Sequence, residues 1–361
     1  MCSQRYAIIT FVRLRSDLVH RDCIVTSSAS AGRKRKKATR KHGLIAAIDI
    51  GGTYIKAALV GPGGDIVDRD HRPTEAHGGS RHVVGRMVDA VRELCEAKGI
   101  AVDSLRGVGV GCAGPLNPED GVVYHSPNLP GWSRVPLKAW TERALGVPVV
   151  VENDANAWTL GEFRFGSGRG LRHMVCLTVG TGLGSGIIVD GRLVHGARGL
   201  AAELGHMTIN TRGVRCSCGN RGCLEAYVSA PAVVRALRRH LRGGARSKVR
   251  ALAARTPGGL TAKVVAQAAR QGDRPARAAL AEVGRNLGVG IANIANIFNP
   301  EMVVIGGAVA GAGRYLLEPA RQEARRRAFR GATQQLKIVR AKLGEDAALL
   351  GAAVPFLEDQ P

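Results

Sequence analysis

The chain has little that would suit a membrane span, a secreted disulfide scaffold or a single-strand nucleic-acid binder. No apolar run approaches the ~18 residues that cross a bilayer, and the apolar segment 7–12 ends at Arg13, which is too short for a secretory signal. Aromatic residues make up only 4% of the chain, and none interleaves with the basic run 33–37, so platforms for stacked bases are missing. The eight cysteines have no regular spacing, which favours a reducing, cytoplasmic setting.

Two signatures of common nucleotide-binding folds are also missing. No G-x4-G-K-[ST] motif occurs, which excludes a P-loop enzyme. The glycine-rich stretch 180–186 superficially resembles a dinucleotide fingerprint, but strands are predicted on both sides of it rather than a strand followed by a helix. A length of 361 residues, 45% hydrophobic content and 48 glycines instead predict an α/β enzyme of about two domains.

The net charge of +23 is concentrated partly in residues 1–43, where 11 Lys and Arg face two acidic residues. We expect this segment to be a disordered basic extension without a catalytic role. Its composition also resembles that of a transit peptide. A third interpretation is that the start of the protein is misassigned, because the pattern of predicted strands begins only near Leu44. Arginine far outnumbers lysine, 41 to 11, which indicates coding bias rather than a nucleic-acid groove, so we expect no specific nucleic-acid partner.

Hydrophobic patterning predicts the same structural motif twice, a hairpin of two apolar strands whose turn contains glycine and threonine. This duplication suggests two similar α/β domains that face each other across a cleft, with the hairpin turns pointing into it. The predicted strands are 44–50, 53–60, 107–111, 147–151, 174–179, 185–189, 302–305 and 336–340. The predicted helices are 83–98, 153–165, 230–241, 261–271, 274–298 and one that starts at 346. A hairpin is predicted at Asp190-Gly191, and a loop from the end of strand 107–111 to Trp132.

The glycine turns are candidate phosphate-binding loops, because glycine lets backbone N–H groups approach phosphate oxygens closely. A third glycine pair follows strand 302–305. Asp49, beside the first turn, suits an indirect role toward Mg2+, whereas Lys56 faces either phosphate or solvent. The candidate residues are Asp49, Gly51, Gly52, Thr53, Lys56, Gly180, Thr181, Gly182, Gly306 and Gly307.

The candidate general base is Asp154, within the segment Glu152-Asn-Asp-Ala-Asn156. An aspartate where a strand passes into a helix could simply be an N-cap. However, an amide beside a carboxylate at a domain junction suits gripping one hydroxyl while deprotonating another.

Three cysteines and a histidine fall within eighteen positions, which is the ligand count of a closed tetrahedral zinc site. Disulfide bonding is the alternative, but Cys216 and Cys218 are too close in sequence for a comfortable bridge, and three is an odd number. No second Cys-x2-Cys pair follows, so the flanking carboxylates Glu203 and Glu225 need another role, such as binding a polar ligand beside the metal. The predicted zinc ligands are His206, Cys216, Cys218 and Cys223.

Together these motifs resemble the ROK (repressor, open reading frame, kinase) family of sugar kinases, over residues 44 to about 357. The resemblance implies the actin/hexokinase-like ATPase fold, with two ribonuclease-H-like domains flanking a cleft. It implies an N-terminal domain of residues 44–155, onto which a C-terminal helix at about 344–357 packs, and a C-terminal domain of residues 156–343 with a zinc-binding loop at 203–225. A homodimer is expected.

The resemblance also implies a cytoplasmic glucokinase of carbohydrate metabolism, at the entry to glycolysis, with ATP, Mg2+ and structural Zn2+ as cofactors. Asp154 would be the general base on the 6-hydroxyl of glucose. His206 would bind zinc through one ring nitrogen and the sugar through the other. The implied sugar-binding residues are Gly114, Asn128, Asn153, Asp154, Glu203, His206 and Glu225.

Several relatives of the same family remain alternatives. They include kinases for N-acetylmannosamine, N-acetylglucosamine, fructose and allose. Glu203 mildly favours glucose, since bacterial N-acetylmannosamine kinases tend to carry histidine there. A polyphosphate donor is disfavoured by the cysteine cluster. A sugar-responsive repressor would carry a helix-turn-helix domain, and residues 1–43 show no clear pair of amphipathic helices.

Overall fold

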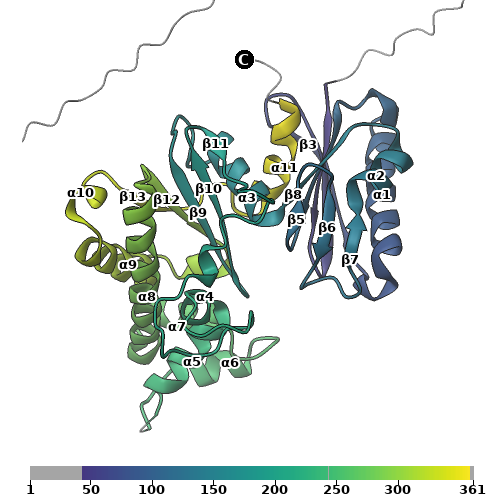
Figure 1. Cartoon of the computed structure of the whole chain (residues 1–361). Coiled ribbons are helices and arrows are strands. Elements are labelled where there is room, and N and C mark those ends of the chain that lie inside the picture. Colours follow the sequence, from purple (N-terminus) through teal and green to yellow (C-terminus); the bar gives the residue numbers. More distant parts are fainter. Residues whose placement is uncertain (1–42, 243, 358–361) are drawn as a thin grey trace, which may run out of the picture. The chain divides into compact units, whose positions relative to one another are not determined.

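The computed structural model describes residues 43–242 and 244–357, so the predicted N-terminal extension lies outside the described residues except for Gly43. Two five-stranded sheets with the same strand order organise the chain (Figure 1). In each sheet the first three strands in sequence are antiparallel neighbours, and two later strands add in parallel beside the first. The two predicted hairpins of apolar strands, 44–50 with 53–60 and 174–179 with 185–189, are therefore confirmed, whereas the outer strand 66–73 of the first sheet was not predicted.

The first sheet has the order β3-β2-β1-β4-β8. Its strands are β1 (Ile45–Ile50), β2 (Tyr54–Val60), β3 (Ile66–Pro73), β4 (Gly107–Cys112) and β8 (Val149–Asn153). One face is covered by α1 (Gly79–Ala97) and α2 (Leu137–Leu145). The opposite face packs on α11 (Ala347–Leu357) through Leu349, Leu350, Ala352 and Ala353.

The second sheet has the order β11-β10-β9-β12-β13. Its strands are β9 (Met174–Val179), β10 (Leu183–Val189), β11 (Arg192–Leu193), β12 (Met302–Gly306) and β13 (Lys337–Arg340). Its larger core contains residues of α4 (Glu225–Val228), α5 (Ala230–His240), α6 (Val249–Ala254), α7 (Ala262–Arg270), α8 (Arg274–Phe298) and α9 (Arg314–Arg327). Trp158 of α3 (Asp154–Arg164) and the start of α11 cover the other face. The short helix α10 (Arg330–Thr333) precedes β13.

Helix α8 shows how local sequence sets these elements. Asp273 caps its N-terminus by accepting the N–H of Ala276 at 2.9 Å, and Pro275 lies in the first turn, where its missing N–H costs nothing. The helix ends at Asn299, whose φ of 44° is the left-handed conformation that stops helices. Buried side chains such as Leu280 and Leu287 then hold it against the sheet.

The prediction of a loop from the end of β4 to Trp132 is wrong, because this segment forms two of the three strands of a small third sheet. Its strands are β5 (Leu116–Asn117), β6 (Val122–His125) and β7 (Ser133–Pro136). They are too short to show an alternating pattern among the Pro, Asn and Gly residues of the segment. The hairpin at Asp190-Gly191 is confirmed, and both residues have positive φ, as a two-residue hairpin turn requires. Within the described residues, no helix combines the length and hydrophobicity that a bilayer crossing needs.

Candidate active site and metal centre

The candidate base segment and the first glycine turn lie at one edge of the first sheet. Strands β1, β4 and β8 run parallel, and Asp49, Gly111 and Glu152 are in register across them. Their carboxyl ends therefore meet at the same edge, where ligands bind in open α/β sheets. Burial, and after it the charge of Asp154, raises the pKa of Asp49, Lys56 partly opposes the shift, and the net result is a pKa of about 6.

The N-cap of α3 is Asn153, so the N-cap reading of its neighbour Asp154 is excluded. The Asn153 side chain accepts the N–H groups of Ala155 at 2.9 Å and Asn156 at 3.2 Å. Its amide donates to the carbonyl of Gly114 at 3.3 Å. Asp154 follows as the first helical residue, with the pKa of its carboxyl raised by burial and partly lowered by hydrogen bonds from Ala155 and Asn153. A carboxyl with a raised pKa next to a fixed amide is a suitable general base.

The first glycine turn is held tightly by its surroundings. The N–H of Gly51 donates to the carbonyl of Tyr54 at 3.0 Å, and the Thr74 hydroxyl donates to the carbonyl of Gly51 at 2.7 Å. A Cβ on Gly52 would lie 2.8 Å from the carbonyl oxygen of Asn128, so only glycine allows this approach. The turn and the predicted sugar-pocket residue Asn128 are therefore in contact, while Thr53 is exposed beside them.

The second glycine turn adjoins the zinc-site loop and the third glycine pair. The N–H of Gly180 donates to the carbonyl of Gly182 at 2.9 Å. Gly307 has a φ of +80° and lies against the backbone of Val179, the last residue of β9. The aromatic ring of Trp158 occupies the space next to Gly306. Thr181, at the tip of the turn, is exposed.

Lys56 lies near two carboxyl groups of the protein, in addition to the phosphate or solvent considered for it. Its ammonium lies 3.4 Å from the carboxylate of Glu345, just before α11, and it lowers the pKa of Asp49. Its charge is therefore partly compensated by two carboxyl groups of the protein itself.

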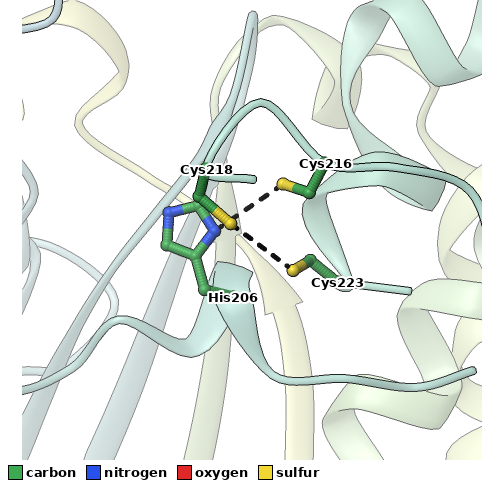
Figure 2. A group of neighbouring side chains, drawn as sticks. All are labelled: His206, Cys216, Cys218 and Cys223. Carbon is green, nitrogen blue, oxygen red and sulfur yellow. Dashed lines mark hydrogen bonds between the residues drawn. The ribbon is translucent and has the colours of Figure 1, made fainter. Parts of the chain in front are cut away.

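The four predicted zinc ligands converge on one point (Figure 2). One donor atom from each of His206, Cys216, Cys218 and Cys223 lies within 4.8 Å of the other three. The Sγ atoms of Cys218 and Cys223 are 3.7 Å apart, far too long for a disulfide. Two thiolates on a tetrahedral zinc, with Zn–S bonds of about 2.3 Å, are separated by about 3.7 Å. The donor set and spacing therefore fit zinc.

The histidine of this cluster has one nitrogen toward the thiols and one toward a carboxylate. Nδ1 of His206 is 3.8 Å from the Cys216 sulfur, and Nε2 is 3.9 Å from the Glu203 carboxylate. Loss of hydration raises the pKa of Glu203, His206 partly opposes this, and the charges of Asp154 and Glu225 raise it again. Glu203 therefore interacts electrostatically with Asp154.

Glu225, predicted to bind sugar, makes contacts within the protein through both oxygens. Oε2 accepts the N–H of Leu183 at 2.9 Å, next to the second glycine turn. Oε1 accepts the Ser217 hydroxyl at 3.1 Å, beside the metal cluster. The same carboxylate thus joins the metal loop to the second turn.

Sequence reasoning missed two residues of this region, Glu152 and His195. Glu152 is 7% exposed, and one of its carboxylate oxygens lies 2.6 Å from Nε2 of His195. The position of Glu152, directly before Asn153 and Asp154 at a strand end, was the available signal. His195 lies 41 positions from Asp154 in an unpatterned loop, so nothing local marks it.

Comparison with known proteins finds one family over the whole described region. The model of the ROK family matches residues 45–358. The glucokinase of Thermotoga maritima is 39% identical over 309 residues, covering 85% of this chain and 95% of the relative. The xylose repressor of Caldicellulosiruptor bescii is 34% identical over 317 residues, covering 88% and 79%. A ROK family glucokinase from Streptomyces griseus, solved with glucose and AMPPNP, has a TM-score of 0.74 and 36% identity, covering 87% and 99%.

Proposed function

This chain belongs to the ROK family, and we propose that it transfers the γ-phosphoryl group of ATP to the 6-hydroxyl of glucose. Its fold is the actin/hexokinase-like ATPase fold. The observation that carries the proposal is the base segment at the edge of the first sheet. There Asn153 caps α3, which leaves Asp154 as a carboxyl of raised pKa beside a fixed amide. Glucokinase relatives at 37–39% identity support glucose as the acceptor.

Asp154 accepts the proton of the attacking hydroxyl as transfer proceeds. Phosphoryl transfer requires positioning and charge stabilisation more than covalent participation by the protein. The other sugar hydroxyls are hydrogen-bonded by Asn153, Gly114 and Glu203, so that the reacting 6-hydroxyl faces Asp154. Backbone amides of the turns at Gly51 and Gly180 bind phosphate oxygens.

Two metals belong to this proposal. Asp49 would hold Mg2+, which when bound would neutralise charge on the phosphates. The cluster of His206 and three cysteines would hold zinc, which would have a structural role and fix the orientation of His206 toward the sugar. Burial and then the neighbouring thiols of Cys218 and Cys216 raise the pKa of the Cys223 thiol to about 12 in the protein without metal, whereas zinc binds the thiolate form. The free cysteines of the described residues support a reducing, cytoplasmic environment.

A sugar-responsive repressor is the second candidate, because relatives named as xylose repressors match 88% of this chain. Release of ADP, coupled to a reporter reaction, should be measured with glucose, fructose, mannose, allose, N-acetylglucosamine and N-acetylmannosamine. We expect the highest kcat/KM with glucose. A preparation that binds sugar but releases no ADP with any of them would favour the repressor and contradict the kinase.

A further inference from the structure

Glu152 is a buried carboxylate placed directly before the base segment, and all its hydrogen bonds serve that segment or one distant histidine. Oε1 accepts the N–H of Asn153 at 2.8 Å and the side-chain amide of Asn156 at 2.9 Å. Oε2 faces Nε2 of His195 at 2.6 Å. Because a buried carboxylate is costly unless it is paired and hydrogen-bonded, His195 completes the environment that keeps Glu152 in place.

His195 is also the anchor of the loop that carries Glu203. Its carbonyl accepts the N–H of Ala201 at 3.0 Å, which closes residues 195–201 into a compact loop. The Ser185 hydroxyl then fixes the end of the loop, by donating to the carbonyl of Ala202 and accepting the N–H of Leu204 at 3.1 Å. The imidazole is therefore held at the start of the loop, and the carboxylate it contacts is held at the start of α3.

The charge of the pair agrees with this geometry. The hydrogen bond that His195 donates to Glu152 raises the pKa of His195, burial opposes the shift, and the attraction between the two groups adds to it. A protonated imidazole can donate from Nε2, and so can the neutral tautomer with its proton there, so the contact persists when His195 titrates.

We propose that His195 is a positioning residue for phosphoryl transfer. Through Glu152 it holds the base segment 152–156 in register with the loop 195–203, so that Asp154 and the hydroxyl-binding Glu203 act on the same sugar. We name this contact the Glu152–His195 strut. The proposal rests on the proposed sugar kinase activity.

The test compares His195→Ala with His195→Gln in the full chain. Misplacing reacting groups by about 1 Å can cost up to 10²-fold in rate, so we expect His195→Ala to lower kcat for glucose about tenfold or more. Slow ATP hydrolysis without sugar should not change, because water as acceptor does not need the loop 195–203. A glutamine amide can still donate to Glu152, so His195→Gln should recover most of the lost kcat.

A matched control and a second variant separate positioning from general stability. His173 has the same side-chain exposure as His195, 36%, and lies 3.6 Å from the more exposed carboxylate of Asp190, so His173→Ala removes a histidine–carboxylate pair outside the site. It should leave kcat unchanged. Glu152→Gln should lower kcat as His195→Ala does, and the double variant should lose no more than either single one, since both remove one contact.

The proposal is overturned if the kcat of His195→Ala stays within about twofold of that of His173→Ala. It is also overturned if His195→Gln melts at about the same temperature as wild type but does not recover the lost kcat. A wild-type protein that phosphorylates no hexose would instead contradict the proposed function, and with it the catalytic role of the strut. The contact itself is then still testable, because the imidazole of His195, followed by nuclear magnetic resonance, should return to an ordinary pKa in Glu152→Gln. An unchanged titration would show that the pair does not form.

Discussion

Glu225 accepts the backbone N–H of Leu183 at 2.9 Å, although the two residues are 42 positions apart. Glu225 is the second residue after the predicted zinc ligand Cys223, and Leu183 begins β10 immediately after the second glycine turn. One hydrogen bond therefore connects the loop of the predicted metal ligands with a candidate phosphate loop, and a change in the structure of either loop should alter the other.

The first prediction disturbs this bond from the side of the turn. A Cβ on Gly182 would lie 2.6 Å from Oε2 of Glu225, so Gly182→Ala should displace the carboxylate and leave the N–H of Leu183 without its acceptor. We expect the KM values for glucose and ATP both to rise about tenfold, as loss of a charged hydrogen bond allows. Gly85→Ala is the control, because a Cβ there meets open space on α1. A rise in only one of the two KM values would argue against the idea that the Glu225–Leu183 hydrogen bond supports both binding sites.

Replacing the proposed base tests the chemistry. Asp154→Asn should keep glucose binding within a few fold and lower kcat by at least about 10²-fold, because general-base catalysis is typically worth that much. Burial raises the pKa of Asp154, so the wild-type rate should increase with pH through a limb above the usual aspartate range, and the variant should lack that limb. Asp89→Asn, an exposed change on α1, serves as the control. Near-normal turnover in Asp154→Asn would remove the base assignment.

Asp49 should make stability depend on pH. Its pKa is raised to about 6 in the folded protein, so the folded state holds this proton more tightly than the unfolded chain does. Ionising Asp49 therefore destabilises the fold, and the penalty grows as pH rises from about 4 to 7. The free energy of unfolding of Asp49→Asn relative to wild type, from urea titrations without Mg2+, should increase by about 2 kcal/mol over that range. A difference that does not vary with pH would contradict the shifted pKa.

Zinc content should follow the cysteine cluster. Wild type should contain one zinc per chain by elemental analysis, and Cys218→Ser should lose most of it together with affinity for glucose, since the metal holds His206 in place. Cys95→Ala, which removes a buried thiol from α1, should lower stability but keep the zinc. Full activity in a metal-free preparation would refute a supporting role for zinc.

Ala202 has a φ of 66° directly before Glu203, in a region that side chains with a Cβ rarely adopt. Ala202→Gly should remove this strain and stabilise the protein by up to about 1 kcal/mol after the entropy cost of glycine. Ala201→Gly, at the neighbouring residue without positive φ, should destabilise by about 0.5–1 kcal/mol. Melting curves that show the same sign for both variants would mean that Ala202 is not strained.

The sequence predicted the repeated hairpins and the main parallel strands because their signals are local. Apolar runs bounded by glycine turns marked β1, β2, β9 and β10, and the predicted helix 274–298 matches α8. Helix α9 was not predicted, because it is rich in arginine and contains Pro319, which normally interrupts helices. Strand β3 alternates half-buried and exposed residues, many of them charged, and so gives little hydrophobic signal.

In the candidate site, too, the parts that could be predicted are those whose residues lie close together in the sequence. The zinc cluster could be predicted because its ligands lie close together in sequence, and the structure brings their donor atoms together. The contacts of Glu152 with His195 and of Glu225 with Leu183 span 43 and 42 residues. Such pairs depend on how distant elements pack, and no single sequence pattern specifies that packing.

The packing of α11 on the first sheet has a consequence for synthesis. The sheet face formed by Ile45, Ala47, Ala58 and Val60 is covered by α11, whose residues follow β1 by about three hundred positions. At translation rates of roughly 5–20 residues per second, that face waits roughly 15–60 s for its cover. The nascent chain therefore carries an exposed apolar surface during this interval, and a chaperone that shields β1 and β2 should increase the yield of folded protein more than one acting after release from the ribosome.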